Sequence, residues 1–173
     1  MDDRRGHRVL ITTVPFGEHC PDAVNRLQAE GIAYTKNPHG RRLKEHELAE
    51  LIGDFELLIA GTEPITARVM DAAPRLRLIS RVGIGLDSVD LLAARARGIH
   101  VSYTPDGPAP AVAELTLGLM LALLRHVAPA DRSVRAGAWR RFMGRRLDGL
   151  TVGVVGVGRV GRRVIRMVRG AFP

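Results

Sequence analysis

The chain has 173 residues, 46% of them apolar, which suits one globular domain or slightly more than one. Its net charge of +8 is unevenly distributed: residues 132–173 hold eleven arginines and one acidic residue, whereas residues 1–131 carry −2. The arginines are scattered, and the seven aromatic residues are not interleaved with them, which argues against a nucleic-acid partner. The basic end instead suggests that a balancing, more acidic segment is missing from the chain.

Cys20 is the only cysteine, so an internal disulfide is excluded and a reducing, cytoplasmic location fits. No apolar run follows residues 1–5, as a signal peptide would require. The most apolar stretch, residues 111–124, contains Glu114 and falls short of the ~20 residues of a membrane span. No cluster of cysteine and histidine has the spacing of a metal site. We therefore expect no membrane segment and no metal.

Up to about residue 104, short runs rich in apolar and β-branched residues alternate with helical ones. The predicted strands are residues 8–13, 32–35, 55–60, 76–82 and 99–103. The predicted helices are residues 22–30, 43–52, 66–73 and 89–97. Thr66 is expected to cap the third helix, and Gly31 and Gly98 to end the first and the fourth. Five β–α alternations favour an α/β fold, whose parallel sheet is covered on both faces and carries its ligand crevice at the carboxyl ends of the strands.

A boundary is marked by four prolines and glycines, which are Pro105, Gly107, Pro108 and Pro110. Residues 111–127 then form a predicted helix that is apolar on nearly every side, which implies burial between two bodies. Pro129 is expected to break this helix, and residues 130–149 are polar, with Trp139 as an isolated apolar anchor. Residues 151–155 read as a strand, and residues 159–169 as a helix.

The pattern G-x-G-x-x-G lies between that last strand and helix, which is the context that makes it a dinucleotide-binding fingerprint. Its glycines permit a tight turn, a close approach of the backbone to a pyrophosphate, and close packing of helix on strand. Free N–H groups at the start of the helix would face the phosphates. The predicted cofactor-binding residues are Gly156, Gly158, Arg159, Val160 and Gly161, and the predicted cofactor is NAD. An acidic residue ~20 positions further on would normally bind the ribose, and no such position is present, so NADP stays open.

Several blocks, in this order, resemble the D-isomer-specific 2-hydroxyacid dehydrogenase family, and within it the phosphoglycerate dehydrogenase-like branch. They include GTEPIT at residues 61–66, ISRVGIGLDSVD at 79–90, AVAELT at 111–116, RAGAW at 135–139 and LDGLT at 147–151. The likeness covers roughly residues 55–170 well and the first fifty loosely.

The resemblance implies a substrate-binding α/β domain with a flavodoxin-like parallel sheet at residues 1–107. It implies that residues 108–173 are an interdomain helix plus the first β–α unit of an incomplete, Rossmann-type NAD-binding domain. By the same resemblance, the family's catalytic arginine, histidine and carboxylate have no counterpart here, so the chain looks truncated. We expect no catalytic residue within it and no activity from the chain alone.

The resemblance also implies hydride transfer between a small 2-hydroxy or 2-oxo acid and a nicotinamide cofactor, in a homodimer. In the family, the loop matching Gly83 and Ile84 holds the substrate carboxylate, and the residue matching Ile84 also contacts the cofactor. Arg81 is a candidate for an electrostatic role towards the substrate. Gly61 and Thr62 stand where some relatives carry an arginine or serine for a substrate phosphate, which is a departure from phosphoglycerate-specific members.

Other polar residues are assigned to structure. Asp90 is expected to cap the helix that follows it rather than act as an acid or base, and the six histidines have no carboxylate at a spacing that makes an obvious dyad. Two alternatives stay open for the whole chain. Beside the dehydrogenase interpretation, the chain could be a non-catalytic module, either dinucleotide-dependent like the corepressors that share this fold or a dimerisation module, or it could be only a fragment without activity of its own.

Overall fold

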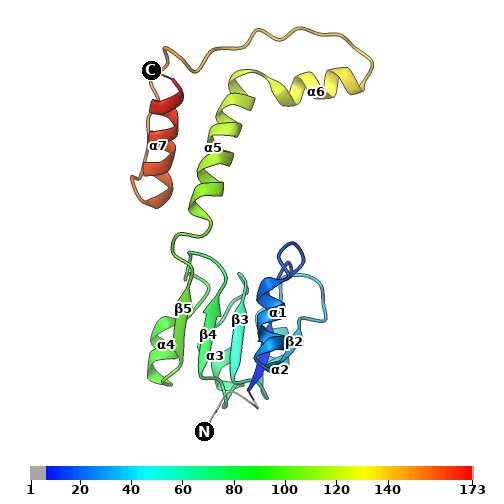
Figure 1. The fold of residues 1–173 in the computed structure, drawn as a ribbon, viewed down its shortest axis with the longest axis vertical. Helices are drawn as coiled ribbons and strands as arrows, with labels where there is room; N and C mark the ends of the chain where they lie inside the picture. The colour runs from blue at the N-terminus through cyan, green and yellow to red at the C-terminus, as the bar shows by residue number, and fades with distance from the viewer. Residues whose placement is uncertain (1–6, 173) are drawn as a thin grey trace. The chain divides into compact units, whose positions relative to one another are not determined.

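The computed structural model describes residues 7–172, and the chain divides into two compact units, Met1–Pro105 and Asp106–Pro173. The first unit is built on a five-stranded parallel sheet with the order β2-β1-β3-β4-β5 (Figure 1). Its strands are β1 (Arg8–Ile11), β2 (Ala33–Lys36), β3 (Leu57–Ala60), β4 (Leu78–Arg81) and β5 (His100–Tyr103). Its helices are α1 (Asp22–Ala29), α2 (Glu45–Leu51), α3 (Ala67–Asp71) and α4 (Leu91–Ala96). The predicted α/β fold with a parallel, flavodoxin-like sheet is confirmed.

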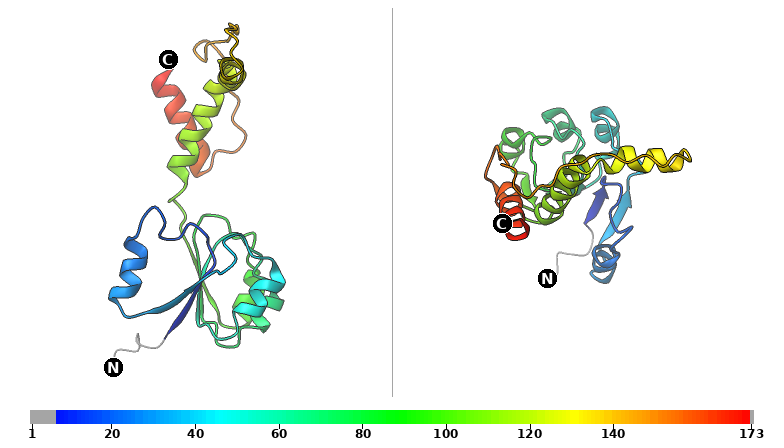
Figure 2. Two further views of the ribbon diagram at one scale, coloured as in Figure 1. Left: turned by 90° about the vertical axis from the view of Figure 1, so that its right-hand side faces the viewer. Right: turned by 90° about the horizontal axis from the view of Figure 1, so that it is seen from above.

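Helices cover both faces of this sheet, with α1 on one side and α2, α3 and α4 on the other (Figure 2). The core lies on the side of α2–α4, because alternate residues of the central strands point there: Leu58 on β3 and Ile79 on β4 are fully buried. Leu48 of α2 and Val69 of α3 join the same apolar cluster. Strands that are apolar on both faces are typical of a parallel sheet enclosed by helices.

The four helices of this unit lie where the sequence predicts, with ends that differ by no more than two residues from the predicted ones. The hydroxyl of Thr66 accepts a hydrogen bond from the Val69 N–H (3.4 Å), and Oδ1 of Asp90 accepts one from the Ala93 N–H (2.8 Å). Both are N-cap bonds, so the structural assignment of Asp90 is confirmed. Gly31 and Gly98 follow α1 and α4 with φ values of 67° and 66°, in the left-handed region that favours glycine.

A charged pair at the start of α2 makes stability depend on pH. Arg41 donates two hydrogen bonds to Glu47 (2.5 and 2.9 Å), and these bonds, with a further one from the Lys44 N–H (2.8 Å), lower the pKa of Glu47 to about 2. Because the carboxyl of an unfolded chain titrates near ~4.3, the stabilisation is complete above that pH and is lost as the pH falls towards 2. Glu47→Gln should therefore lower the urea midpoint at pH 7. The difference in urea midpoint between the variant and the unchanged protein should shrink as the pH falls from about 4.5 to about 2, the range between the unfolded and the folded pKa.

The control for this prediction is Glu50→Gln, which removes the same charge from an exposed position of the same helix. It should change the midpoint at pH 7 much less than Glu47→Gln does. A constant difference between Glu47→Gln and the unchanged protein from pH 7 to pH 2 would contradict the linkage.

The second unit contains three helices, α5 (Ala109–Leu124), α6 (Val127–Arg135) and α7 (Arg159–Ala171), with α7 packed against α5 (Figures 1 and 2). The predicted helix at 111–127 is wrong at its end. It stops at Leu124, and a new helix begins after His126, whose φ of 56° breaks the helical path. Pro129 does not end a helix but lies in the first turn of α6, where its missing N–H has no helical partner to lose.

Within residues 7–172, no single helix combines the length and hydropathy of a membrane span. Only α5 and α6 taken together reach them, across a bend of 64° between the two helices.

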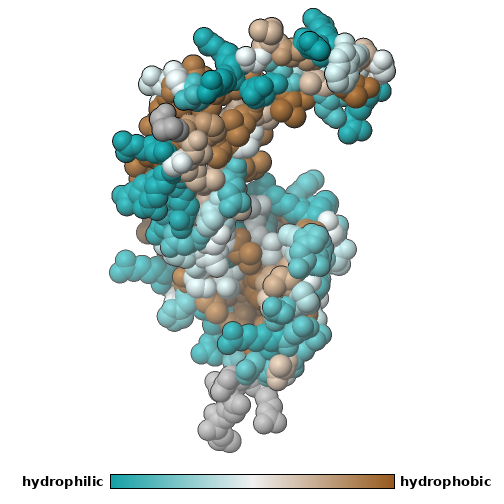
Figure 3. Space-filling view, turned by 45° about the horizontal axis from the view of Figure 1, so that its top comes forward, coloured by the Kyte–Doolittle hydropathy of each residue, from teal (hydrophilic) through white to brown (hydrophobic). Residues whose placement is uncertain are grey.

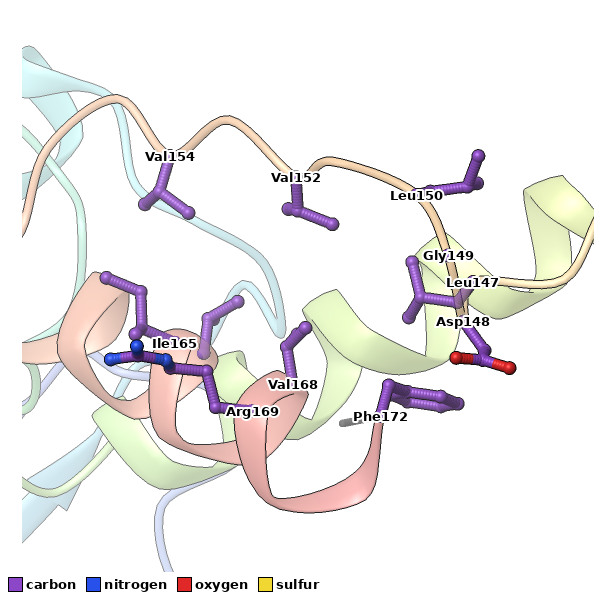
Figure 4. A pocket seen from close by; sticks show the side chains of 11 residues that line it. Leu147, Asp148, Gly149, Leu150, Val152, Val154, Ile165, Val168, Arg169 and Phe172 are labelled. Carbon is purple, nitrogen blue, oxygen red and sulfur yellow. The ribbon is translucent and has the colours of Figure 1, made fainter.

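The predicted strand at 151–155 is also wrong, because these residues form no strand and pair with no other strand among the described residues. A strand exists only through its ladder with neighbours. Instead, the side chains of Val152 and Val154 point towards α7 across a cavity of about 450 Å3 that is also lined by Ile165 and Val168 (Figure 4).

Candidate functional site

The carboxyl ends of the strands carry a glycine turn after β4, at the edge where parallel sheets bind ligands. Gly83 has a φ of +147° and donates its N–H to the Thr104 hydroxyl (2.9 Å) and to the Arg81 carbonyl (3.0 Å). These two bonds hold the backbone of the turn in place and use the N–H of Gly83. The N–H groups of Ile84 and Gly85 donate to no acceptor among the residues that the structure describes. They are therefore the amides of this turn that can bind an anion.

The side chain of Arg81 packs against the glycine turn that follows β4. It is only 8% exposed, its guanidinium donates to the Val82 carbonyl, and its buried Nε has no partner within residues 7–172. A side chain at Gly83 would meet Arg81 Nη1 at 2.6 Å. The arginine thus lies against the turn rather than reaching into solvent, and it gives the turn a positive potential.

A buried carboxylate at the same edge was not singled out from the sequence. Glu63 is 1% exposed, and its Oε1 accepts hydrogen bonds from the Gly61 N–H (3.0 Å) and from the hydroxyl of Thr12. Thr12 follows β1, 51 positions earlier in the chain. A glutamate within a turn after a strand normally reads as an exposed residue, so nothing local in the sequence indicates its burial.

The fingerprint lies in the second unit, at the start of α7. Gly156 has a φ of +89°, which favours glycine, and a Cβ at Gly161 would overlap the Gly156 carbonyl oxygen. The turn and the first helical turn are therefore in direct contact, as the predicted roles of the two glycines require. At Gly158, by contrast, a Cβ would meet nothing within 4 Å, which leaves open space over the turn.

The start of α7 offers hydrogen-bond donors to an anion. The N-cap, Gly158, provides no side chain, and the first N–H bonded within the helix is that of Arg162 (3.0 Å to the Gly158 carbonyl). The amides of Arg159, Val160 and Gly161 are therefore free of helical partners. With the helix dipole, they favour a phosphate group at this point, so the residues present fit the diphosphate of a dinucleotide.

Basic side chains surround this helix start. A cavity of about 440 Å3 is lined by Asp106, Gly158, Arg159, Arg162, Arg163 and Arg166. Arg159 pairs with Asp106 (3.1 Å), and Nε of Arg162 donates to the Val157 carbonyl (3.0 Å). The arrangement can bind an anion, and Asp106 competes with that anion for Arg159.

The structure places the predicted site residues in two groups. Arg81, Gly83 and Ile84 belong to one turn of the first unit, whereas the cofactor-binding residues from Gly156 to Gly161 belong to one turn of the second. Among the described residues, none of the six histidines forms a hydrogen bond or ion pair with a residue of either turn.

Comparison with known proteins agrees with this geometry. The family model for the D-isomer specific 2-hydroxyacid dehydrogenase catalytic domain matches residues 9–169. The D-3-phosphoglycerate dehydrogenase of Methanocaldococcus jannaschii is 41% identical over 164 residues, which cover 92% of this chain and 30% of that protein. The hydroxypyruvate reductase of Thermotoga maritima is 39% identical over 127 residues, which cover 72% of this chain and 42% of that protein.

Among solved structures, the TT0316 protein from Thermus thermophilus superposes with a TM-score of 0.83 at 37% identity. The match covers 94% of this chain and 53% of that one. The chain thus spans about half the length of this structure and less than half of the two curated relatives.

Proposed function

Because the chain belongs to the family of D-isomer specific 2-hydroxyacid dehydrogenases, oxidoreductases that use NAD(P)H, we propose that it provides two parts of such an enzyme. Residues 1–107 are the substrate-binding domain, and residues 108–173 are the interdomain helix and the beginning of the NAD-binding domain. The proposed reaction, of the phosphoglycerate dehydrogenase-like kind, transfers a hydride between a small 2-hydroxy acid and NAD. The observation that carries the proposal is the start of α7, where the amides of Arg159, Val160 and Gly161 have no helical partner and a Cβ at Gly158 would meet nothing within 4 Å.

The cofactor turn would hold the pyrophosphate of NAD. Gly156 and Gly161 shape the turn, Gly158 leaves room for the ligand, and Arg159 and Val160 supply backbone donors. The bound dinucleotide supplies the hydride chemistry, and the protein supplies binding and orientation.

The glycine turn of the first unit would hold the substrate. The amides of Ile84 and Gly85 would donate to the substrate carboxylate, and the side chain of Ile84 would contact the cofactor. Gly83 and Arg81 act through this turn: Gly83 sets its shape, and Arg81 supports it and favours a negative ligand. We assign no catalytic acid or base to residues 7–172, so the proton transfer that accompanies hydride transfer is outside this assignment.

The ion pair at the fingerprint offers a direct test of the cofactor site. Asp106→Asn frees Arg159 and removes a negative charge from the cavity, so NAD should bind about 2–5-fold more tightly, as expected for an exposed pair worth up to ~1 kcal/mol. Arg159→Gln should weaken NAD binding by a similar or larger factor. Both effects should diminish when salt is raised, and titration calorimetry or fluorescence can measure them.

The matched control is Asp148→Asn, which removes the same charge from the same unit, where Asp148 pairs with Arg146 away from the fingerprint. It should leave NAD affinity within twofold. If Asp106→Asn and Asp148→Asn change the affinity equally, only net charge matters and the assignment of Arg159 is wrong.

We further propose that the second unit forms a homodimer through α5. This helix is packed against α7 on one side, while Val112, Leu115, Leu119 and Leu123 recur on another side at helical spacing and are 42–77% exposed. Figure 3 shows apolar side chains at the surface of this part of the chain. A contiguous apolar stripe of this kind is typical of an interface, and a second copy presents an identical stripe, as a two-fold dimer requires.

A further inference from the structure

We propose that the side of α7 formed by Arg159, Arg162, Arg163 and Arg166, here called the arginine face, binds an oligophosphate chain of three or more phosphates. Nucleoside triphosphates then compete with NAD for the start of this helix. The proposal rests on the proposed function in one point, that the amides at the start of α7 bind phosphate. It goes further in giving a role to side chains beyond those amides and in naming a second class of ligand.

The arginine face lines one cavity of the second unit, the cavity of about 440 Å3 that also includes Gly158 and Asp106. Its four members are three or four positions apart along α7, so they lie on the same side of the helix. Side chains on a helix lean towards its N-terminus, and the face extends over roughly 10 Å of helix. A chain of phosphates that begins at the free amides can therefore continue along the arginines.

Most of the positive charge of the arginine face is unpaired. Within residues 7–172, Arg159 alone among its members forms an ion pair, with Asp106 (3.1 Å). Nε of Arg162 donates to the Val157 carbonyl (3.0 Å), and the side chains of the other two members have no hydrogen bond or ion pair with any described residue. Glu114 of α5 lines a neighbouring cavity with these two but pairs with neither. The larger cavity thus carries four positive charges against one negative charge, an excess that a triphosphate matches better than the diphosphate of NAD does.

The arginines also oppose the electrostatics of their own helix. The N-terminus of a helix favours acidic side chains, yet the first turn of α7 contains none and begins with Arg159. Like charges three or four positions apart repel each other, and every member of the arginine face has such neighbours. Nε of Arg163 is buried without a hydrogen-bond partner among the described residues, which is rare in folded proteins. Local rules are broken in this way mainly at functional sites, and a bound polyanion would offset the repulsion.

The length of the phosphate chain should therefore determine the affinity. Inorganic triphosphate should bind about 5–30-fold more tightly than inorganic diphosphate, which corresponds to ~1–2 kcal/mol, as expected for two further exposed ion pairs. ATP should bind at least as tightly as inorganic triphosphate and should displace NAD. Equal affinities of the two would assign recognition to the phosphates alone, and tighter binding of ATP would add a contact with the nucleoside.

The test titrates the isotope-labelled 173-residue chain with inorganic diphosphate, inorganic triphosphate, ATP and NAD, at constant ionic strength and without divalent cations. Binding is read from the amide resonances of Arg159, Val160 and Gly161. Competition is measured by adding ATP to the chain saturated with NAD. Constant ionic strength is needed because salt screens exposed charges.

Single substitutions separate the arginine face from net charge. Arg163→Gln and Arg166→Gln should each weaken triphosphate binding by about 2–5-fold and leave diphosphate binding within twofold. Arg169→Gln is the matched control, because Arg169 belongs to the same helix, has no ion pair among the described residues and lines a different cavity. It should leave the affinity for both ligands within twofold.

Thermal unfolding separates ligand binding from a packing role. Because Arg163→Gln removes an unpaired like charge, the Tm of the ligand-free chain should stay the same or rise slightly. The increase in Tm that triphosphate causes should shrink, since stabilisation by a ligand follows its affinity. A lower ligand-free Tm with an undiminished increase would show that the arginine is structural.

The outcomes for the two proposals differ. Equal binding of diphosphate and triphosphate, equal losses in the variants at positions 163, 166 and 169, or ATP that does not displace bound NAD would overturn the inference alone. If triphosphate moves the amides at the start of α7 and NAD does not, the proposed cofactor is wrong and the oligophosphate site stands. If no ligand moves them, both the cofactor site and the inference are wrong.

Discussion

Replacing Gly161 with alanine is expected to lower the affinity for NAD by at least tenfold, and by about 100-fold if two phosphate hydrogen bonds are lost. Binding should then no longer be detectable. The added Cβ would overlap the Gly156 carbonyl oxygen, and both atoms belong to backbone segments that cannot rotate away. The start of α7 must therefore move from the turn, and the amides that face the phosphates move with it. Charge-assisted hydrogen bonds contribute about 1.5–3 kcal/mol each, so the loss of two, even at the lower end of that range, accounts for a factor of at least about 100.

Gly170→Ala is the matched control, since Gly170 is in the same helix and a Cβ there would meet nothing within 4 Å. It should bind NAD as the unchanged chain does and should be as stable or slightly more stable, because alanine favours helix over glycine. Circular dichroism checks that Gly161→Ala keeps its helix content. A folded Gly161→Ala protein with unchanged NAD affinity would contradict the role assigned to the third glycine.

Leu119→Glu is expected to convert the proposed dimer to a monomer at micromolar concentration. Leu119 lies in the middle of the exposed stripe on α5, so in a two-fold dimer it would be buried near its counterpart. Burying a glutamate there without a partner costs several kcal/mol in each copy. The dimer dissociation constant should rise by at least about 30-fold, which corresponds to ~2 kcal/mol, and sedimentation equilibrium can measure it.

Leu92→Glu provides the control, because Leu92 is an 82% exposed leucine on α4 of the first unit and the charge change is identical. It should leave the dissociation constant unchanged. A clean monomer of the unchanged chain at micromolar concentration would show that the α5 stripe is not a dimer interface.

The sheet could be predicted from the sequence because its signals are local. Apolar β-branched runs of the right length are separated by Thr66, Asp90, Gly31 and Gly98, each of which starts or ends a helix by its own chemistry. Strand order follows from parallel β–α alternation with few alternatives. The glycines of the fingerprint were likewise predictable, since their roles depend on the turn itself.

Features that depend on distant parts of the chain could not be predicted. Residues 151–155 have a strand-like sequence, but a strand forms only with neighbours that pair with it. The end of α5 was mispredicted for a local reason instead: His126 adopts a left-handed conformation that its residue type does not indicate, whereas Pro129 is the usual helix-breaking residue. The burial of Glu63 depends on Thr12, which is brought to it only by the pairing of β1 with β3.

The central claim, that the start of α7 binds the pyrophosphate of NAD, is tested most directly by titrating the isotope-labelled chain with NAD. The amides of Arg159, Val160 and Gly161 should shift in a saturable way, with a dissociation constant above about 1 µM, while Gly170 in the same helix stays in place. Adenosine, which has no phosphate, should leave all four unchanged. Unmoved amides at Arg159, Val160 and Gly161 in about 10 mM NAD, a concentration that detects even millimolar binding, would contradict the claim.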